Sequence, residues 1–233
     1  MNALSKIVTL SIFAAGAAVI ASAAPSPAQI ARPAVVYPGG GIVTPAPVCC
    51  QLTTKPIDTG SAGWTVKLPS GPVITPVPVV PKHPAWAAPL PGSQWIANVA
   101  NAGQAGQPGG TYIYTYHFCL CQLPGGIKTV PASLTLHIYA DDDFVAKLNG
   151  VQIAQKTGGY GFNMPPGGTP VSIASTNFTQ CDNVLTFEVH NMLNALSPTG
   201  LDVAGSVSGY FQDVAPGKPC PCGRPINPTL NQN

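Results

Sequence analysis

Charged side chains are scarce in this chain of 233 residues. Ten Lys or Arg and eight Asp or Glu make up only 8% of the residues, whereas charged residues form about a quarter of an average globular protein. The only arginines are Arg32 and Arg224. Because binding to a phosphate backbone relies on clustered Lys and Arg, we expect no nucleic-acid partner. Hydrophobic residues still account for 45% of the chain, so a folded core is expected in place of general disorder.

Long apolar runs are missing except near the N-terminus. Lys6 precedes an apolar stretch from Ile7 to Ile20, and Ala21-Ser22-Ala23 offers a small-residue cleavage site. About 14 apolar residues are too few to span a bilayer, so the pattern predicts a secretory signal peptide over residues 1–23. A buried core helix is the alternative. We therefore expect a mature protein without a membrane span that is secreted, periplasmic or held at the cell surface.

Seven cysteines fit an oxidising compartment, where disulfides form. If Cys119 and Cys121 lie in one strand, their Cβ atoms are about 7 Å apart, which is too far for a bond between them. Both are then expected to pair with other segments, and an odd thiol could link two molecules. Free thiols, or a metal site of His117, Cys119 and Cys121, are the alternatives. The disulfide candidates are Cys49, Cys50, Cys119, Cys121, Cys181, Cys220 and Cys222.

Proline and glycine divide the chain into a body and two tails. Residues 24–48 are rich in Pro, Ala, Gly and Val and predict an extended arm or linker. Residues 49–215 form the predicted folded domain, and residues 216–233 a tail that contains Pro and Cys. Within residues 72–80, the three prolines occupy the even positions 72, 76 and 78, so in a strand their missing N–H groups would all lie along one edge. This pattern predicts an edge strand that cannot recruit another chain on its outer side, with a polyproline-like arm as the alternative.

Apolar residues alternate with polar ones through most of the body, and no stretch after the signal peptide has helical periodicity. In Thr111–Cys121, one face carries Tyr112, Tyr114, Tyr116, Phe118 and Leu120. The same period of two occurs in 133–139, 183–190 and 201–211, with shorter strands at 144–148, 151–155 and 171–178. Asn149-Gly150 is typical of a hairpin turn. The pattern predicts an all-β protein, an antiparallel β-sandwich or jelly roll.

Several short motifs stand out in this strand pattern, namely Ser93-Gln94-Trp95-Ile96, Tyr114-x-Tyr116-x-Phe118, Ala140-Asp141-Asp142-Asp143, Leu148-Asn149-Gly150, Asn183-x-Leu185-x-Phe187-x-Val189-x-Asn191, Thr199-Gly200-Leu201 and Gly205-x-Val207-x-Gly209. Together they resemble the galactose-binding-like jelly rolls of secreted bacterial proteins. The resemblance covers about residues 60–210. It implies a carbohydrate-binding-module or lectin-type sandwich. The cysteines are not part of the common pattern.

Two loops carry the candidate ligand-binding residues. Asp141, Asp142 and Asp143 form the only acidic cluster, which could contact a ligand, hold Ca²⁺ or cap a turn. Tyr160 and Phe162 lie in the glycine-rich segment 158–168. Aromatic rings can stack on the apolar faces of sugars. The tryptophans Trp64, Trp86 and Trp95 could do the same, or could simply be core residues.

Catalysis is not expected, and no cofactor is expected apart from the possible Ca²⁺. Glu188 is the only Glu, whereas glycosidases use two carboxylates at a defined separation. No G-x-S-x-G motif of a serine hydrolase is present. The outward histidines His117, His137 and His190 would form a His cluster if their strands are neighbours.

Two functions follow from these patterns. The first is a non-catalytic, exported β-sandwich that binds carbohydrate or another cell-surface component. The alternative is a structural subunit of an extracellular filament, pilus or surface layer, which would assemble by adding its N-terminal arm to a neighbour's sheet edge.

Overall fold

A computed structural model of the chain describes residues 51–121, 132–174, 177–179, 181–192 and 197–211. The predicted signal peptide, arm and C-terminal tail lie outside the described residues, as do Cys49, Cys50, Cys220 and Cys222. Within the described ranges all regular structure is β, and none of it is a helix that could cross a bilayer. The twelve strands are β1 (Gln51–Asp58), β2 (Thr65–Lys67), β3 (Val73–Ile74), β4 (Val77–Pro78), β5 (Ile96–Ala97), β6 (Gly110–Leu120), β7 (Ser133–Asp141), β8 (Asp143–Leu148), β9 (Val151–Lys156), β10 (Thr169–Ala174), β11 (Cys181–Asn191) and β12 (Gly200–Phe211).

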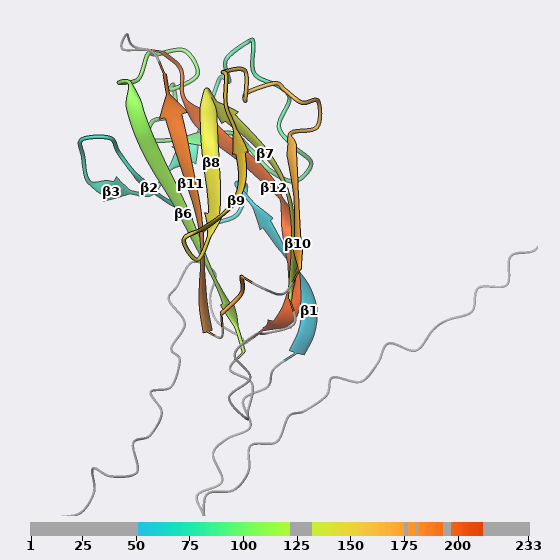
Figure 1. The fold of residues 1–233 in the computed structure, drawn as a ribbon. Helices are drawn as coiled ribbons and strands as arrows, with labels where there is room; N and C mark the ends of the chain where they lie inside the picture. The colour runs from blue at the N-terminus through green and yellow to red at the C-terminus, as the bar shows by residue number, and fades with distance from the viewer. Residues whose placement is uncertain (1–50, 122–131, 175–176, 180, 193–196, 212–233) are drawn as a thin grey trace, which may run out of the picture.

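The strands form two layers packed face to face (Figure 1). One layer has the order β10-β7-β12, with β1 and β5 along the other side of β12 and β4 beside β5. The second layer has the order β9-β8-β11-β6, continued by β2 and β3. The layers join where Phe211 pairs with Leu120, and every strand pair is antiparallel. The predicted all-β antiparallel sandwich is confirmed.

The main core lies between the two layers and contains the side chains that alternation predicted. All five apolar residues of the inward face of β6 are 7% exposed or less. Equivalent residues of β7, β11 and β12 are also buried, and each large side chain contributes about 1.5–3 kcal/mol of burial. Gly205 is needed where β12 approaches β7, because a Cβ there would lie 2.0 Å from the carbonyl oxygen of Thr135. The inward side chains of these strands include Leu134, Leu136, Ile138, Leu185, Phe187, Val189, Leu201, Val203 and Val207.

The proline-rich segment 72–80 does not form the single edge strand that was predicted. Val73–Ile74 pairs with β2 in the second layer, whereas Val77–Pro78 pairs with β5 in the first. The amide of Val79 then donates to the carbonyl of Trp95 at 2.9 Å. The chain therefore crosses from one layer to the other at residues 75–76. Proline parity shows which amides are missing, but it does not show which sheet receives the remaining ones.

A second, smaller core covers the outer face of the first layer. It is built from residues 79–102, whose Trp86 and Trp95 rings stack with centroids 4.3 Å apart. Trp95 also stacks on Tyr139, which points away from the main core but is buried beneath this segment. Trp64, Trp86 and Trp95 are all buried. The three tryptophans are therefore core residues and present no ring to a ligand.

Asp202 on β12 attaches this second core to the sheet. Its carboxylate accepts hydrogen bonds from the amide of Leu90 at 2.9 Å and from the hydroxyls of Ser93 and Thr59. The side chain is fully buried, and burial raises the pKa of the carboxyl. Hydrogen bonds from three donors on two segments compensate for removing the group from water.

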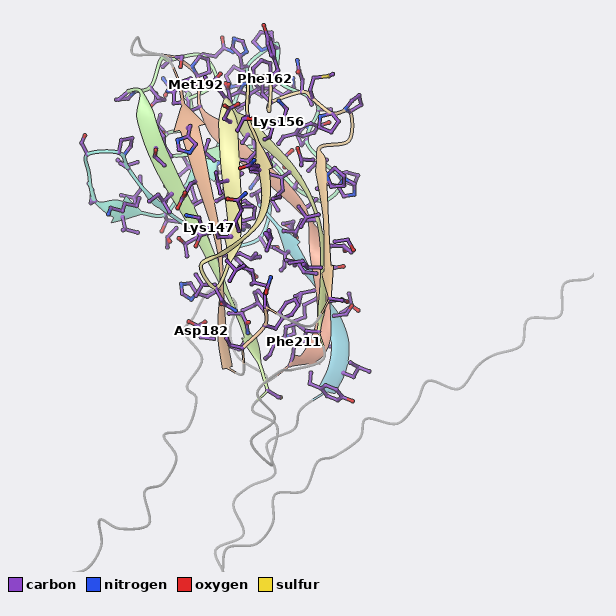
Figure 2. All side chains as sticks on the ribbon, in the orientation of Figure 1. Lys147, Lys156, Phe162, Asp182, Met192 and Phe211 are labelled. Atoms are coloured by element: carbon purple, nitrogen blue, oxygen red, sulfur yellow. The ribbon has the colours of Figure 1, made fainter. Side chains whose placement is uncertain are left out.

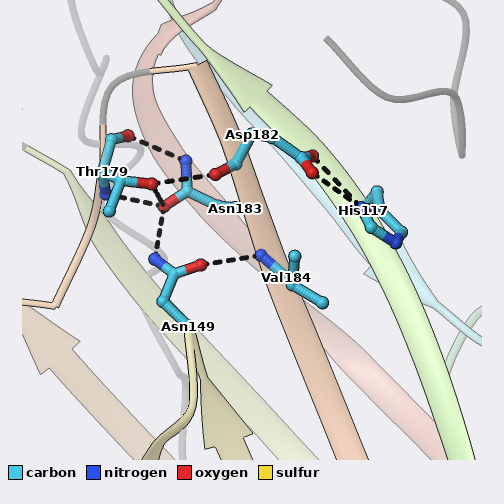
Figure 3. Close-up of polar contacts among 6 residues, drawn as sticks. All are labelled: His117, Asn149, Thr179, Asp182, Asn183 and Val184. Atoms are coloured by element: carbon cyan, nitrogen blue, oxygen red, sulfur yellow. Dashed lines mark hydrogen bonds and ion pairs between the residues drawn. The ribbon is translucent and has the colours of Figure 1, made fainter.

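The β8–β9 hairpin turn is confirmed at Asn149-Gly150, where φ is +52° and +81°. Figure 3 shows how this turn is attached to the start of β11. Asn149 Nδ2 donates to Asn183 Oδ1 at 2.9 Å, and Asn149 Oδ1 accepts from the amide of Val184 at 2.9 Å. Asn183 Nδ2 in turn donates to the carbonyl of Thr179 at 2.9 Å. These asparagines therefore have a structural role.

Candidate functional site

The acidic segment and the glycine-rich segment meet in space. Asp143, the first residue of β8, accepts hydrogen bonds from the amides of Gly158 and Gly159 at 3.1 and 2.7 Å. The amide of Gly161 donates to the carbonyl of Asp142 at 3.0 Å, and Gly161 in turn accepts from the amide of Ala140 at 3.1 Å. A Cβ on Gly161 would lie 2.4 Å from the Asp142 carbonyl oxygen. The loop after β9 is therefore tied closely to the β7–β8 junction.

The three carboxylates of the acidic cluster have different partners. Asp141 Oδ2 accepts from Trp86 Nε1 at 2.7 Å, and Asp142 Oδ2 accepts from the amide of Met192 at 2.9 Å. Asp143 caps the glycine turn. In the part of the chain that the structure describes, no three His, Cys, Asp or Glu side chains are grouped to hold a metal ion. The geometry thus favours turn capping over a shared Ca²⁺ site.

Asp141 is a buried carboxyl beside an indole. Its pKa is raised to about 8, mainly by burial and also by the neighbouring Asp142 carboxyl, whereas the Trp86 N–H acts to lower it. The protein surroundings therefore favour the protonated form of this carboxyl. Neutral Asp141 can be buried against the second core at far lower cost than its ionised form.

Tyr160 is an exposed aromatic ring on a loop that is held in place. Its side chain is 65% exposed, and its φ of +62° lies in the left-handed region. Such a backbone costs a residue with a Cβ about 1–2 kcal/mol. Besides the Asp143 cap, Lys156 Nζ donates to the carbonyls of Thr157 and Gly159 at 2.9 and 2.8 Å. These bonds hold the turn that presents the ring.

Phe162 lies beside Tyr160 and connects the loop to the second core. The two ring centroids are 5.8 Å apart, and Phe162 packs partly buried on the second core. Its carbonyl accepts from the amide of Ala87 at 2.9 Å, and Asn163 Nδ2 donates to the carbonyl of Ala85 at 3.3 Å. Residues 83–87 therefore flank the loop of Tyr160.

Sequence reasoning missed Met192 at this end of the molecule. Figure 2 places Lys156, Phe162 and Met192 together at one end of the sandwich, opposite Asp182 and Phe211. Met192 is exposed, and only strand register brings it near residues 141–143, since β11 pairs His190 with Asp143. No local sequence signal marks it. We call the surface formed by residues 83–87, 141–143, 157–168 and Met192 the loop end.

The predicted histidine cluster is wrong. His117 and His190 both lie on the second layer, but His117 pairs with Val184, which is six positions from His190 along β11, or about 20 Å. His117 contacts Asp182 at 3.0 Å, and His190 contacts the Thr111 hydroxyl at 3.1 Å. His137 lies on the first layer, within hydrogen-bonding distance of the carbonyl of Gly167 at 2.8 Å. Antiparallel register, which the sequence does not reveal, separates them.

Glu188 and the described cysteines are also engaged within the protein. Glu188 forms an ion pair with Lys147 at 2.5 Å on the outer face of the second layer. Cys119 and Cys121 are buried and disulfide-bonded. Neither therefore offers the thiolate that the alternative metal site with His117 would need. The side chain of Cys181 lies outside the described part of the structure.

No family model matches the chain, and no curated protein matches it. Among solved structures, it is similar to an FMN-binding beta-glucuronidase from Facaelibacterium prausnitzii L2-6, with 18% identity and a TM-score of 0.36 over 66% of this chain. The chain spans only 23% of that enzyme's length. It is also similar to a family 35 carbohydrate binding module from an environmental isolate, with 12% identity and a TM-score of 0.33 over 70% of this chain and 99% of the module. Likenesses at this level do not assign a function, which we therefore argue from the loop end.

Proposed function

We propose that this protein is a non-catalytic, exported β-sandwich that binds carbohydrate at a cell surface or in its surroundings through the loop end. The observation that carries the proposal is Tyr160, a largely exposed ring held in a left-handed backbone by the bonds of Asp143 and Lys156. Strained backbone that is held by surrounding bonds is concentrated at functional sites. Sugar rings have apolar C–H faces, which an aromatic ring can cover without a deep pocket.

The carboxylates of the described residues support a binding role over a catalytic one. Asp141, Asp142 and Asp143 each accept hydrogen bonds from the protein, and Glu188 is ion-paired with Lys147. Glycoside hydrolysis by the common mechanism needs one carboxyl to protonate the leaving group and a second to act as nucleophile or base. Export is supported by the N-terminal sequence pattern.

The test is retention of the mature protein, residues 24–233, in native gels that contain single polysaccharides. Galactan, glucan, mannan and xylan are the probes. Tyr160→Ser is compared with Leu52→Ser, because Leu52 on β1 is equally exposed at 66% but belongs to a different part of the sandwich. We expect at least one polysaccharide to retard the wild type and Leu52→Ser but not Tyr160→Ser. Retention that Tyr160→Ser leaves unchanged, or no retention by any polysaccharide, would refute the proposal.

The filament alternative depends on residues 24–48, which lie outside the described residues, and it stays a prediction. Comparing native, non-reducing masses with and without residues 24–48 tests it. A polymer that falls to a monomer when the arm is removed would favour the structural role.

A further inference from the structure

The two lysines that flank the loop end, Lys82 and Lys156, are already bound to the protein's own backbone. Lys156 Nζ donates to the carbonyls of Thr157 and Gly159. On the neighbouring segment, Lys82 Nζ donates to the carbonyl of Trp86 at 2.8 Å and to that of His83 at 3.4 Å. Moving either ammonium group towards a ligand would break the bonds that hold these loops.

The acidic side chains at the loop end are bound to the protein in the same way, but one of them remains partly exposed. Asp143 is buried against the amides of Gly158 and Gly159, and Asp141 is buried against Trp86. Asp142 is half-buried and accepts from the amide of Met192. The exposed side chains of the loop end are uncharged, and the large ones among them are Tyr160, Met164 and Met192. The surface thus offers apolar contact beside an acidic group.

We propose that the loop end takes uncharged sugar units and discriminates against anionic ones such as uronates and sulfated sugars. The inference rests on the proposed function and names its ligand class. A carboxylate or sulfate placed over Tyr160 would lose water without gaining a cation, because Lys156 and Lys82 are already engaged. It would also approach the carboxylate of Asp142. Selectivity then comes from an unfavourable interaction with the wrong ligand.

The test uses one polymer in two charge states. Polygalacturonate with free carboxylates is compared with the same polymer after methyl esterification, by gel retention of the mature protein alongside the neutral panel. We expect the esterified polymer to bind at least about tenfold more tightly than the acid form. We also expect the affinity for uncharged polymers to be constant between about 0.1 and 1 M salt, over which the Debye length falls from about 10 to 3 Å.

The two proposals fail in different ways. Tighter binding of the acid form, with affinity falling as salt rises, would overturn the ligand class and leave carbohydrate binding standing. If no polymer, charged or uncharged, is retained, carbohydrate binding itself is refuted, and the ligand class falls with it.

A lysine variant gives a second readout, the ratio of the affinities for the acid and esterified forms of the polymer. A less stable loop would weaken both affinities alike and leave this ratio unchanged. Lys156→Gln is compared with Lys147→Gln, whose lysine pairs with Glu188 on the sheet face. If Lys156 serves only the loop, its replacement weakens binding of both forms of the polymer by the same factor. A loss confined to the acid form would show that Lys156 pairs with the ligand, and would overturn the inference.

Discussion

Replacing Tyr160 with glycine separates binding from stability. The tyrosine is 65% exposed and has φ +62°. Glycine removes a left-handed strain of about 1–2 kcal/mol but adds about 0.5–1 kcal/mol of backbone entropy to the unfolded chain. Because little ring burial is lost, we expect the free energy of unfolding to stay within about 1 kcal/mol of the wild-type value. Urea unfolding followed by tryptophan fluorescence measures it.

Binding should respond very differently to the same substitution. A sugar that covers about 100 Å² of the ring gains about 2.5 kcal/mol at 25 cal/mol per Å². Losing this contact weakens affinity roughly seventyfold, measurable by titration calorimetry with the retained polysaccharide. Tyr160→Asn is the control, since Asn tolerates a left-handed backbone without supplying a ring. Near wild-type affinity in Tyr160→Gly would refute the stacking argument, and a destabilisation beyond about 2 kcal/mol would refute our account of an exposed, strained residue.

Three further predictions concern the surrounding structure. Asp143→Ala leaves the amides of Gly158 and Gly159 without their acceptor; we expect about 1–3 kcal/mol of lost stability in urea unfolding and weaker polysaccharide binding, with Asp143→Asn in between. The pKa of Asp141 is raised from 3.8 to about 8, so between these pH values the folded state holds a proton that the unfolded chain has lost. The free energy of unfolding therefore falls as pH rises from about 4 to 8, by at most ~1.4 kcal/mol per pH unit. Asp141→Asn should reduce this slope to the part that the buried Asp202 contributes, and equal pH profiles of the two proteins would contradict the assignment. Gly205→Ala places a Cβ 2.0 Å from the Thr135 carbonyl; we expect about 3 kcal/mol or more of destabilisation in the same unfolding assay, and a fully stable variant would show that β7 and β12 are not packed so closely.

The loop-end residues show how far sequence reasoning reaches for a candidate site. Asp141, Asp142, Asp143, Tyr160 and Phe162 were singled out by residue type, and the structure brings their two loops together. Whether they bind a ligand stays a prediction. The directions of the Asp141 and Asp142 carboxylates and the contribution of Met192 depend on partners about 50 residues or more away along the chain.

The sequence by itself determined the all-β class, the inward faces of β6, β7, β11 and β12, and the Asn149-Gly150 turn. Alternation and turn chemistry are local properties, because successive strand side chains point to opposite faces and a tight turn needs particular backbone angles. Only the tertiary structure decided that residues 72–80 divide between two sheets and that the histidines lie apart. It also decided that Tyr139 and Asp202, on an outward face, are buried under a second core. Strand partners and register come from contacts between distant segments, and a strand's outer face has the same local pattern whether water or another segment covers it.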